Sequence, residues 1–292
     1  MTTNPKTLAL LAAFCTLILW AFAFPASKAA LDHYNVQQVV LFRYLVACLF
    51  FLVLLMMKLF PLPKAKDMPA ICLLGVLGIS VYQLLFVFGM GEVEAGAASM
   101  VIAVNPVMAS LMARFFFKEQ LTKRAWSGIF LGAAGVCIIS FVKGTDGSTI
   151  GFVAMLLASM SIAIYFVFQK PYFSRYSPLA MTAYTCWGGT IPLLIFLPET
   201  ITASAAAPPS AISWIVIMGI FSSGVGFIFW IYALSKLQAG TVTSFLFLQP
   251  IFVVAMSWLW FGELPGVSTL IGGAVVLAGV GLIVSQSFKP RS

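Results

Sequence analysis

Charged residues are scarce in this sequence. Only 8% of its 292 residues are Asp, Glu, Lys or Arg, whereas 62% are hydrophobic. In a soluble domain, roughly a quarter of the residues are charged and lie on the surface. The composition of this chain therefore excludes a soluble domain. Long apolar runs recur from end to end, each close to the ~20 residues that cross the hydrocarbon core of a bilayer. The composition predicts an all-α membrane protein.

Acids, lysines and histidine are missing from the centres of these apolar runs. The single histidine, His33, lies in a predicted loop. An enzyme would need an acid–base pair or a metal cluster, and neither can be assembled from these residues. We therefore expect no enzymatic activity, no metal and no cofactor. Because no acid lies within the membrane, the sequence shows no binding site for a coupling ion. Facilitated diffusion and proton exchange both remain possible transport modes.

Cysteine is present but has no spacing typical of a metal site. The five cysteines all lie inside apolar runs, where we expect buried free thiols that act as small hydrophobic residues. They are Cys15, Cys48, Cys72, Cys137 and Cys186. The net charge of +8 does not predict nucleic-acid binding, because no Lys/Arg run is interleaved with aromatic residues.

Ten apolar segments can be drawn, and short joins with breakers or charges separate them. They cover about 7–30, 36–57, 69–90, 96–117, 124–142, 150–170, 178–198, 211–235, 240–261 and 267–287. The first run, with Ala21-Phe22-Ala23 near its end, also resembles a signal peptide. We expect an uncleaved first helix, because its removal would leave an odd half of the duplication described below.

The basic residues are concentrated on one side of the predicted bundle. If the N-terminus is cytoplasmic, the outer side carries only Lys28 and Lys143. The inner side carries Lys6, Lys58, Lys64, Lys66, Lys118, Lys123, Arg124, Lys170, Arg175, Lys236, Lys289 and Arg291. Cytoplasmic loops are enriched in Lys and Arg, so we expect both termini in the cytoplasm, in a cell inner (plasma) membrane.

One stretch occurs twice, at 96–119 and at 240–263, with glycine, proline and glutamate at identical spacing and no gap. A polar amide precedes the proline in both copies, as Asn105-Pro106 and Gln249-Pro250. Five predicted segments cross the membrane between Glu119 and Glu263, and because five is odd, the second copy must point the opposite way across the membrane. The sequence therefore predicts ten transmembrane helices as two inverted five-helix repeats, 1–146 and 147–292.

Several short motifs follow one another in an order that is itself informative. They are Leu19-Trp20-Ala21-Phe22-Ala23-Phe24, Phe42-Arg43-Tyr44-Leu45, Trp230-Ile231-Tyr232-Ala233-Leu234, Ala239-Gly240, Gln249-Pro250, Gly262-Glu263 and Gly272 with Gly279-Val280. Their order and duplication resemble the EamA family of the drug/metabolite transporter superfamily, over essentially the whole chain. The resemblance implies ten helices with cytoplasmic termini, alternating access, and a central cavity that helices 5 and 10 do not line.

The residues that could line such a cavity are aromatic or carry amides and hydroxyls. The ninth predicted segment (240–261) has no Lys or Arg, and the fourth (96–117) has only Arg114. A phosphorylated substrate would therefore have too few cations to bind to. Aromatic and amide walls suit small amphipathic, unphosphorylated solutes. The candidates are Trp20, Phe24, Tyr82, Gln83, Phe86, Asn105, Tyr165, Gln169, Trp230 and Gln249, with the hydroxyls of Ser80, Ser222 and Ser223. Each aromatic could equally face lipid or pack between helices.

Two prolines and one arginine lie within predicted membrane helices, where such residues are unfavourable. Pro106 and Pro250 each remove an intrahelical hydrogen bond, and we interpret them as hinges of a gate, with a static kink as the alternative. Arg43 is expected to reach outward or to pair with an outer acid such as Asp32. The family resemblance favours a structural or gating role for Arg43 over contact with the substrate.

The sequence thus predicts an inner-membrane transporter that exports small organic metabolites, with amino acids or their derivatives as the favoured class. Drug efflux, transport of nucleosides or other metabolites, and a non-transporting membrane scaffold are the alternatives. Small-residue faces on helices 5 and 10 predict close helix packing and allow a homodimer. These faces contain Gly128, Gly132, Gly135, Gly272, Gly273, Gly279 and Gly281.

Overall fold

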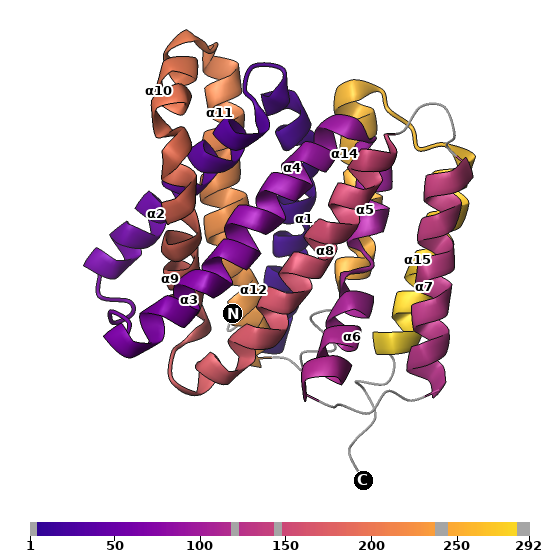
Figure 1. Ribbon diagram of the computed structural model, residues 1–292, viewed down its shortest axis with the longest axis horizontal. Helices are drawn as coiled ribbons and strands as arrows, with labels where there is room; N and C mark the ends of the chain where they lie inside the picture. The colour runs from indigo at the N-terminus through magenta and orange to yellow at the C-terminus, as the bar shows by residue number, and fades with distance from the viewer. Residues whose placement is uncertain (1–4, 118–122, 143–147, 237–244, 285–292) are drawn as a thin grey trace.

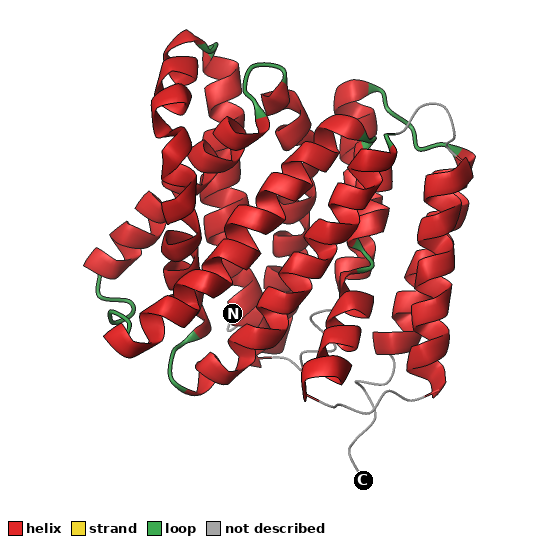
Figure 2. Cartoon of the chain, viewed as in Figure 1, coloured by secondary structure: helices red, strands yellow, loops and turns green. Residues whose placement is uncertain are grey.

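The computed structural model describes residues 5–117, 123–142, 148–236 and 245–284, and every regular element in these ranges is helical (Figure 2). The α-helices are α1 (Pro5–Leu31), α2 (Val36–Met56), α3 (Met68–Gly75), α4 (Tyr82–Glu92), α5 (Ala95–Ile102), α6 (Asn105–Phe117), α7 (Lys123–Val142), α8 (Thr149–Gln169), α9 (Pro178–Thr190), α10 (Leu197–Ala206), α11 (Pro209–Ile217), α12 (Gly226–Lys236), α14 (Gln249–Phe261) and α15 (Val267–Val284). The 3-10 segments are η1 (Ala65–Asp67), η3 (Lys170–Ser174), η4 (Ile191–Phe196) and η6 (Phe245–Leu248), and the π-helical segments are η2 (Val76–Val81) and η5 (Met218–Val225).

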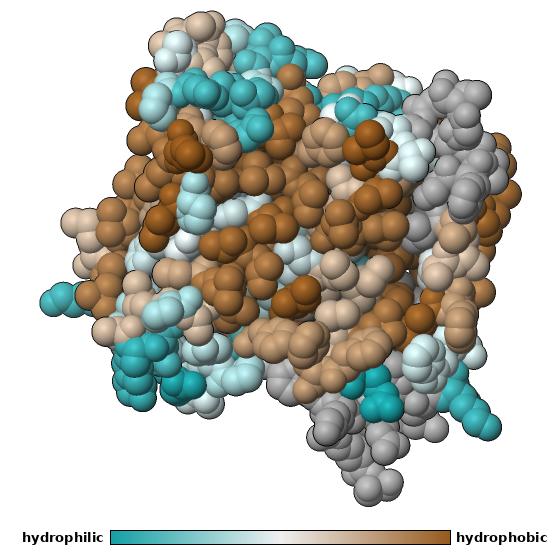
Figure 3. Space-filling model, in the orientation of Figure 1, coloured by the Kyte–Doolittle hydropathy of each residue, from teal (hydrophilic) through white to brown (hydrophobic). Residues whose placement is uncertain are grey.

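Six helical spans within the described residues are long and apolar enough to cross a membrane. They are Pro5–Leu31, Val36–Met56, Ala65–Glu92, Thr149–Ser174, Pro178–Ala206 and Pro209–Ala233. The hydropathy of the surface agrees, because an apolar band crosses the visible face between polar edges (Figure 3). The seventh predicted segment runs further than expected, since helix continues through η4 and α10 to Ala206.

Two of these spans change to π-helix midway, which the sequence analysis did not foresee. The segment η2 joins α3 to α4, and η5 joins α11 to α12. A π-helical turn widens the backbone by one residue and turns side chains away from the register of the flanking α-helix. Because Gly75 and Gly219 border or lie within these segments at the repeat spacing, both π-helical turns occupy matching places in the duplicated sequence.

The predicted helix at 96–117 is broken. Helix α5 ends at Ile102, two turn residues follow, and α6 starts at Asn105. Pro106 and Pro250 are each the second residue of a helix, α6 and α14, rather than interior residues of a continuous one. A proline in the first turn removes an N–H that has no intrahelical acceptor. The expected mid-helix kink is therefore corrected: Pro106 lies in the first turn of α6, after a break, and Pro250 lies in the first turn of α14, directly after the 3-10 segment η6.

The helices pack in recurring pairs. Helix α1 packs against α12 and α14, and α8 packs against α4 and α6. Helices α7 and α15 form a close pair at one edge of the bundle (Figure 1). At Gly135 an added Cβ would lie 2.6 Å from the Gly272 carbonyl oxygen, and at Gly279 it would lie 2.6 Å from that of Gly128. The predicted small-residue faces thus pack against each other within the chain.

Candidate functional site

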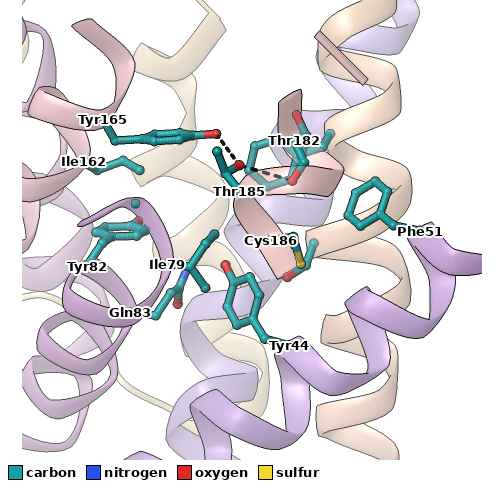
Figure 4. A pocket seen from close by; sticks show the side chains of 13 residues that line it. Tyr44, Phe51, Ile79, Tyr82, Gln83, Ile162, Tyr165, Thr182, Thr185 and Cys186 are labelled. Carbon is teal, nitrogen blue, oxygen red and sulfur yellow. Dashed lines mark hydrogen bonds between the residues drawn. The ribbon is translucent and has the colours of Figure 1, made fainter. Parts of the chain in front are cut away.

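A narrow cavity lies between α2, the η2–α4 junction, α8, α9 and the η5–α12 junction (Figure 4). Its volume is about 30 Å³, which is room for one or two water molecules. Pockets that hold organic ligands measure about 300–1,000 Å³, so the cavity is constricted. Its lining consists of Tyr44, Tyr82, Gln83, Tyr165, Thr182, Thr185, Cys186 and Ser223, with Phe51, Gly78, Ile79, Ile162 and Phe227.

Tyr165 closes one side of this cavity, and a glycine makes room for its ring. The Tyr165 hydroxyl lies 3.2 Å from Thr185 Oγ1. Because the Thr185 hydroxyl donates to the Met181 carbonyl oxygen at 2.8 Å, Tyr165 is the donor in the contact drawn in Figure 4. A Cβ at Gly78 would lie 2.6 Å from Cγ of the Tyr165 ring. The glycine in η2 therefore lets the ring lie directly on the helix backbone.

Arg43 lies next to this cavity and is buried, with 5% of its surface exposed. Its Nε donates to Ser223 Oγ at 2.9 Å. Its Nη1 donates to Gln83 Oε1 at 3.3 Å, and its Nη2 to Ser222 Oγ at 3.2 Å. The expectation that Arg43 reaches outward or pairs with Asp32 is wrong, because three neutral side chains hold the guanidinium inside the bundle.

The aromatic ring of Tyr44 also contacts this arginine. The guanidinium carbon lies 5.7 Å from the ring centroid, within the range of a cation–π contact. On the other side of the two serines, Trp20 Nε1 donates to the Ser222 carbonyl oxygen at 3.1 Å. The π-helical segment η5 thus serves as an acceptor for both Arg43 and Trp20.

Of the ten predicted cavity residues, the structure brings three to the cavity wall. These are Tyr82, Gln83 and Tyr165. Trp20 and Trp230 form a second layer, with ring centroids 5.1 Å apart. Phe24 and Phe86 pack edge to face with centroids 5.0 Å apart. Asn105, Gln169 and Gln249 lie near helix ends, at the start of α6, the end of α8 and the start of α14, and none of them lines this cavity.

Part of the cavity wall was not predicted from the sequence. Thr182, Thr185 and Cys186 come from α9, which carries no charge and offered no polar motif. Tyr44 follows Arg43 directly and was read only as part of a motif. Phe227 is one turn from the Trp230 motif. A helical-face projection of the seventh segment would have placed Thr182, Thr185 and Cys186 on one side, since they lie three and four positions apart.

Two ion pairs join parts of the chain that lie far apart in the sequence. At one face, Lys28 of α1 pairs with Glu263, which follows α14, and the ammonium also lies 5.9 Å from the centroid of the Phe261 ring. We call this pair the Lys28 latch. Glu119, the counterpart of Glu263 in the repeat, lies outside the described residues.

At the opposite face, Asp67, Arg175 and Tyr176 form what we call the Asp67 latch. Arg175 Nη1 donates to Asp67 Oδ1 at 2.7 Å, and the Tyr176 hydroxyl donates to Asp67 Oδ2 at 2.7 Å. Burial and the hydrogen bond to Asp67 raise the pKa of Tyr176, so this phenol stays protonated and keeps donating at neutral pH. The Tyr176 oxygen also accepts from the Lys64 N–H at 3.0 Å.

The five cysteines are free thiols, as expected, but they are not all buried. Cys15 and Cys137 are exposed on the surface of apolar helices. Cys48 of α2 and Cys186 of α9 lie with their sulfur atoms 3.7 Å apart, and the Cys48 thiol also donates to Thr190 at 3.3 Å. A thiol pair therefore joins two helices beside the cavity.

Comparison with known proteins identifies the family. The model of the EamA-like transporter family matches residues 7–141 and matches again at residues 149–285. The chain belongs to the EamA-like transporter family. It is thus a membrane transporter, as the order of its motifs predicted.

Alignments to named relatives cover nearly the whole chain. An uncharacterized transporter of Bacillus subtilis, YdfC, is 36% identical over 90% of this chain and 86% of its own length. A probable terminal-alkyne amino-acid exporter of Streptantibioticus cattleyicolor is 36% identical over 94% of this chain and 93% of its own length. A solved crystal structure, 15% identical, superposes with a TM-score of 0.66 over 97% of this chain and 98% of its own, which shows a shared fold.

Proposed function

We propose that this EamA-like protein exports amino acids or close derivatives across the plasma membrane. The observation that carries the substrate class is the 36% identity, over 94% of this chain, to a protein named as a probable terminal-alkyne amino-acid exporter. The lining of the cavity supports the same class. Aromatic rings, an amide and hydroxyls surround it, and such groups suit a small amphipathic solute that carries no phosphate.

The proposal includes ten transmembrane helices in two inverted repeats, 1–146 and 147–292, with both termini in the cytoplasm. The double match to the family model supports the two repeats. So does the packing, because exchanging the halves turns the α1–α12 pair into α8–α4 and the α1–α14 pair into α8–α6. A pseudo-two-fold axis in the membrane plane produces this exchange.

In the proposed mechanism the two halves rock around the cavity between them. Each latch joins the first half to the second, one at each face. Access from one side requires the latch on that side to open while the other stays closed, because two open faces would leak. Pro106 and Pro250 begin helical segments directly after backbone irregularities, and we propose that these positions bend during the motion.

Tyr82, Gln83 and Tyr165 are the residues proposed to touch the solute. Trp20, Phe24, Phe86 and Trp230 are proposed to form the wall behind them, which the solute reaches when the cavity widens. Asn105, Gln169 and Gln249 form a third group of proposed cavity residues. They lie at helix ends that rocking would displace. A homodimer that forms through α7 and α15 would use their outward sides, since Gly135 and Gly279 face the other helix within the chain.

Counterflow in proteoliposomes tests the proposal. Vesicles loaded with one amino acid at high concentration should accumulate radiolabelled amino acid from outside, and empty vesicles should not. Tyr165→Phe is an informative variant, because it removes only the hydroxyl that donates to Thr185. Exchange of nucleosides such as uridine, with no exchange of any amino acid, would replace this substrate class with one of its rivals.

The scaffold alternative needs a different measurement. Single cysteines at Asn105 and Gln249, in a chain whose native cysteines are replaced, should react with a membrane-impermeant maleimide from at least one side of the membrane. A chain that shows no exchange of any solute and no labelling of either position would be a scaffold.

A further inference from the structure

Arg43 occupies a place where an isolated charge is costly. It lies seven residues into α2, which is about 10 Å from the start of that helix at 1.5 Å per residue. Its side chain belongs to the buried interior of the bundle. A guanidinium in such surroundings is ordinarily paired with an anion or coordinated by several carbonyl oxygens.

The partners of this guanidinium are all neutral. Three of its five N–H groups donate to Ser223, Gln83 and Ser222, and an arginine carries five such donors. The acids Asp67 and Glu263 pair with Arg175 and Lys28, not with Arg43. The hydrogen bonds of Arg43 are thus partly satisfied, while its positive charge has no partner of opposite sign among the contacts described.

Two of these three neighbours and one aromatic ring connect this charge to the cavity. Gln83 and Ser223 accept hydrogen bonds from Arg43 and also line the cavity, as does Tyr44, whose ring lies over the guanidinium. The guanidinium therefore lies directly behind the polar part of the cavity wall. Displacing a single side chain, that of Gln83, would expose Nη1 to a solute in the cavity.

We propose that Arg43 is the anion site of this transporter and that the transported solute carries a carboxylate. This inference rests on the transport function proposed above and names the substrate group that the site selects. A carboxylate brings the opposite charge to the guanidinium and can accept two parallel N–H bonds from it, whereas the Gln83 amide oxygen is neutral. The solute therefore takes the place of Gln83 Oε1, whose contact at 3.3 Å is the longest of the three.

A carboxylate fits this site better than a phosphate does. The residues that line the cavity include no Lys, Arg or His. Arg43 behind the wall therefore supplies one positive charge and one planar set of N–H donors. One guanidinium neutralises one carboxylate, whereas a phosphate dianion would bring a second charge into the bundle without compensation. The tyrosine rings that line the rest of the wall offer their faces to an ammonium or an apolar side chain.

The first arm of the test uses the wild-type protein in the counterflow assay. The competitors are leucine, its carboxamide, its decarboxylated amine, its 2-oxo acid and uridine. We expect leucine and the 2-oxo acid, which both carry a carboxylate, to inhibit at concentrations at least tenfold lower than the carboxamide and the amine do, roughly the effect of leaving a buried charged donor unpaired. Equal inhibition by leucine and leucinamide would overturn the inference and leave amino-acid transport intact.

The second arm replaces the arginine. Arg43→Gln should lose the preference for the carboxylate over the carboxamide, and Arg43→Lys should retain part of it because the charge remains. Arg114→Gln, at an exposed arginine of α6, is the matched control and should keep the wild-type preference. A folded Arg43→Gln protein with the wild-type preference ratio would assign Arg43 a purely structural role and overturn the inference.

The outcomes separate this inference from the function on which it rests. Exchange of the 2-oxo acid but of no amino acid, with dependence on Arg43, would refute the amino-acid proposal and support the carboxylate site. Exchange of uridine alone would refute both. If Arg43→Gln and Arg43→Lys fail to fold, the wild-type competitor ratios decide the question by themselves.

Discussion

The crossing of α3 and α9 beside the cavity leads to a sharp prediction about Gly189→Ala. A Cβ added at Gly189 would lie 2.3 Å from the Gly75 carbonyl oxygen and 2.7 Å from the Cβ of Ile79. Favourable contacts between heavy atoms require roughly 3.5 Å, so the two helices must move apart by about 1 Å. The Ser80 hydroxyl, which donates to the Gly189 carbonyl oxygen, would be drawn away from its acceptor by the same shift.

The expected cost follows from these two effects. Overpacking a close contact destabilises a protein by about 1–3 kcal/mol, and weakening a buried hydrogen bond adds about 1 kcal/mol. Helix association in a bilayer relies on close packing rather than on the hydrophobic effect, so the loss is not offset by burial. We expect Gly189→Ala to lower the free energy of unfolding by about 2–4 kcal/mol relative to a glycine-to-alanine change at an uncrowded helix position. It should also slow exchange, because Ile79 and Thr185 of this crossing line the cavity.

Reversible unfolding in mixed detergent micelles at increasing SDS fraction measures this free energy. Gly91→Ala in α4 is the matched control, because its added Cβ would meet only Leu31 Cδ1, at 3.4 Å. Alanine is the better helix former by about 1 kcal/mol, so the control should be neutral or slightly stabilising. Equal stability of Gly189→Ala and Gly91→Ala would refute the reasoning that the α3–α9 crossing is at contact distance.

Three further predictions concern the latches, the thiol pair and the proposed hinges. Reversing either charge of the Lys28–Glu263 pair should change the rate of exchange less than about fivefold, because partly exposed pairs contribute up to about 1 kcal/mol; the double reversal should restore the rate, and a double variant as impaired as the single ones would contradict the pairing. Oxidation by copper phenanthroline should join Cys48 to Cys186, with loss of two thiols, and slow exchange until dithiothreitol is added, whereas Cys48→Ser should be insensitive to the oxidant. Pro106→Ala should slow transport more than it lowers expression, and an equal loss of both would reduce this proline to a structural role.

The helical architecture was largely predictable, because its causes lie in local composition. Apolar runs near bilayer length predicted the six long spans that the described residues contain, and the breakers between them predicted the joins. Helix α2 starts where expected because Asn35 and Gln38 form a capping box, each side chain accepting from the backbone N–H of the other. The paired glycines of the fifth and tenth segments predicted a close helix contact, and Gly135 and Gly279 both lie within one.

The breaks in the helices and the partners of the buried charge could not be predicted in the same way. Pro106 predicted an irregularity in this segment, but the apolar residues Val101–Val104 give no sign that the helix already stops at Ile102. A π-helical turn changes the periodicity by a single residue. The position of Arg43 was misjudged for a different reason. Its acceptors Ser222 and Ser223 lie about 180 residues away in the sequence, so only the packing of α2 against η5 reveals them.

The contacts of Arg43 also give a physical reason why binding and rocking would be linked under the proposed mechanism. Two of its hydrogen bonds cross from the first half of the chain to η5 in the second half, and the third stays within the first half, to Gln83. A carboxylate that takes the place of Gln83 neutralises the guanidinium and competes with the two serine hydroxyls for its N–H donors, because an Arg–carboxylate pair is commonly bidentate. The same event that fills the cavity therefore loosens a link between the halves. An uncharged solute of equal size would fill the cavity without this effect, and so it would be bound without being moved.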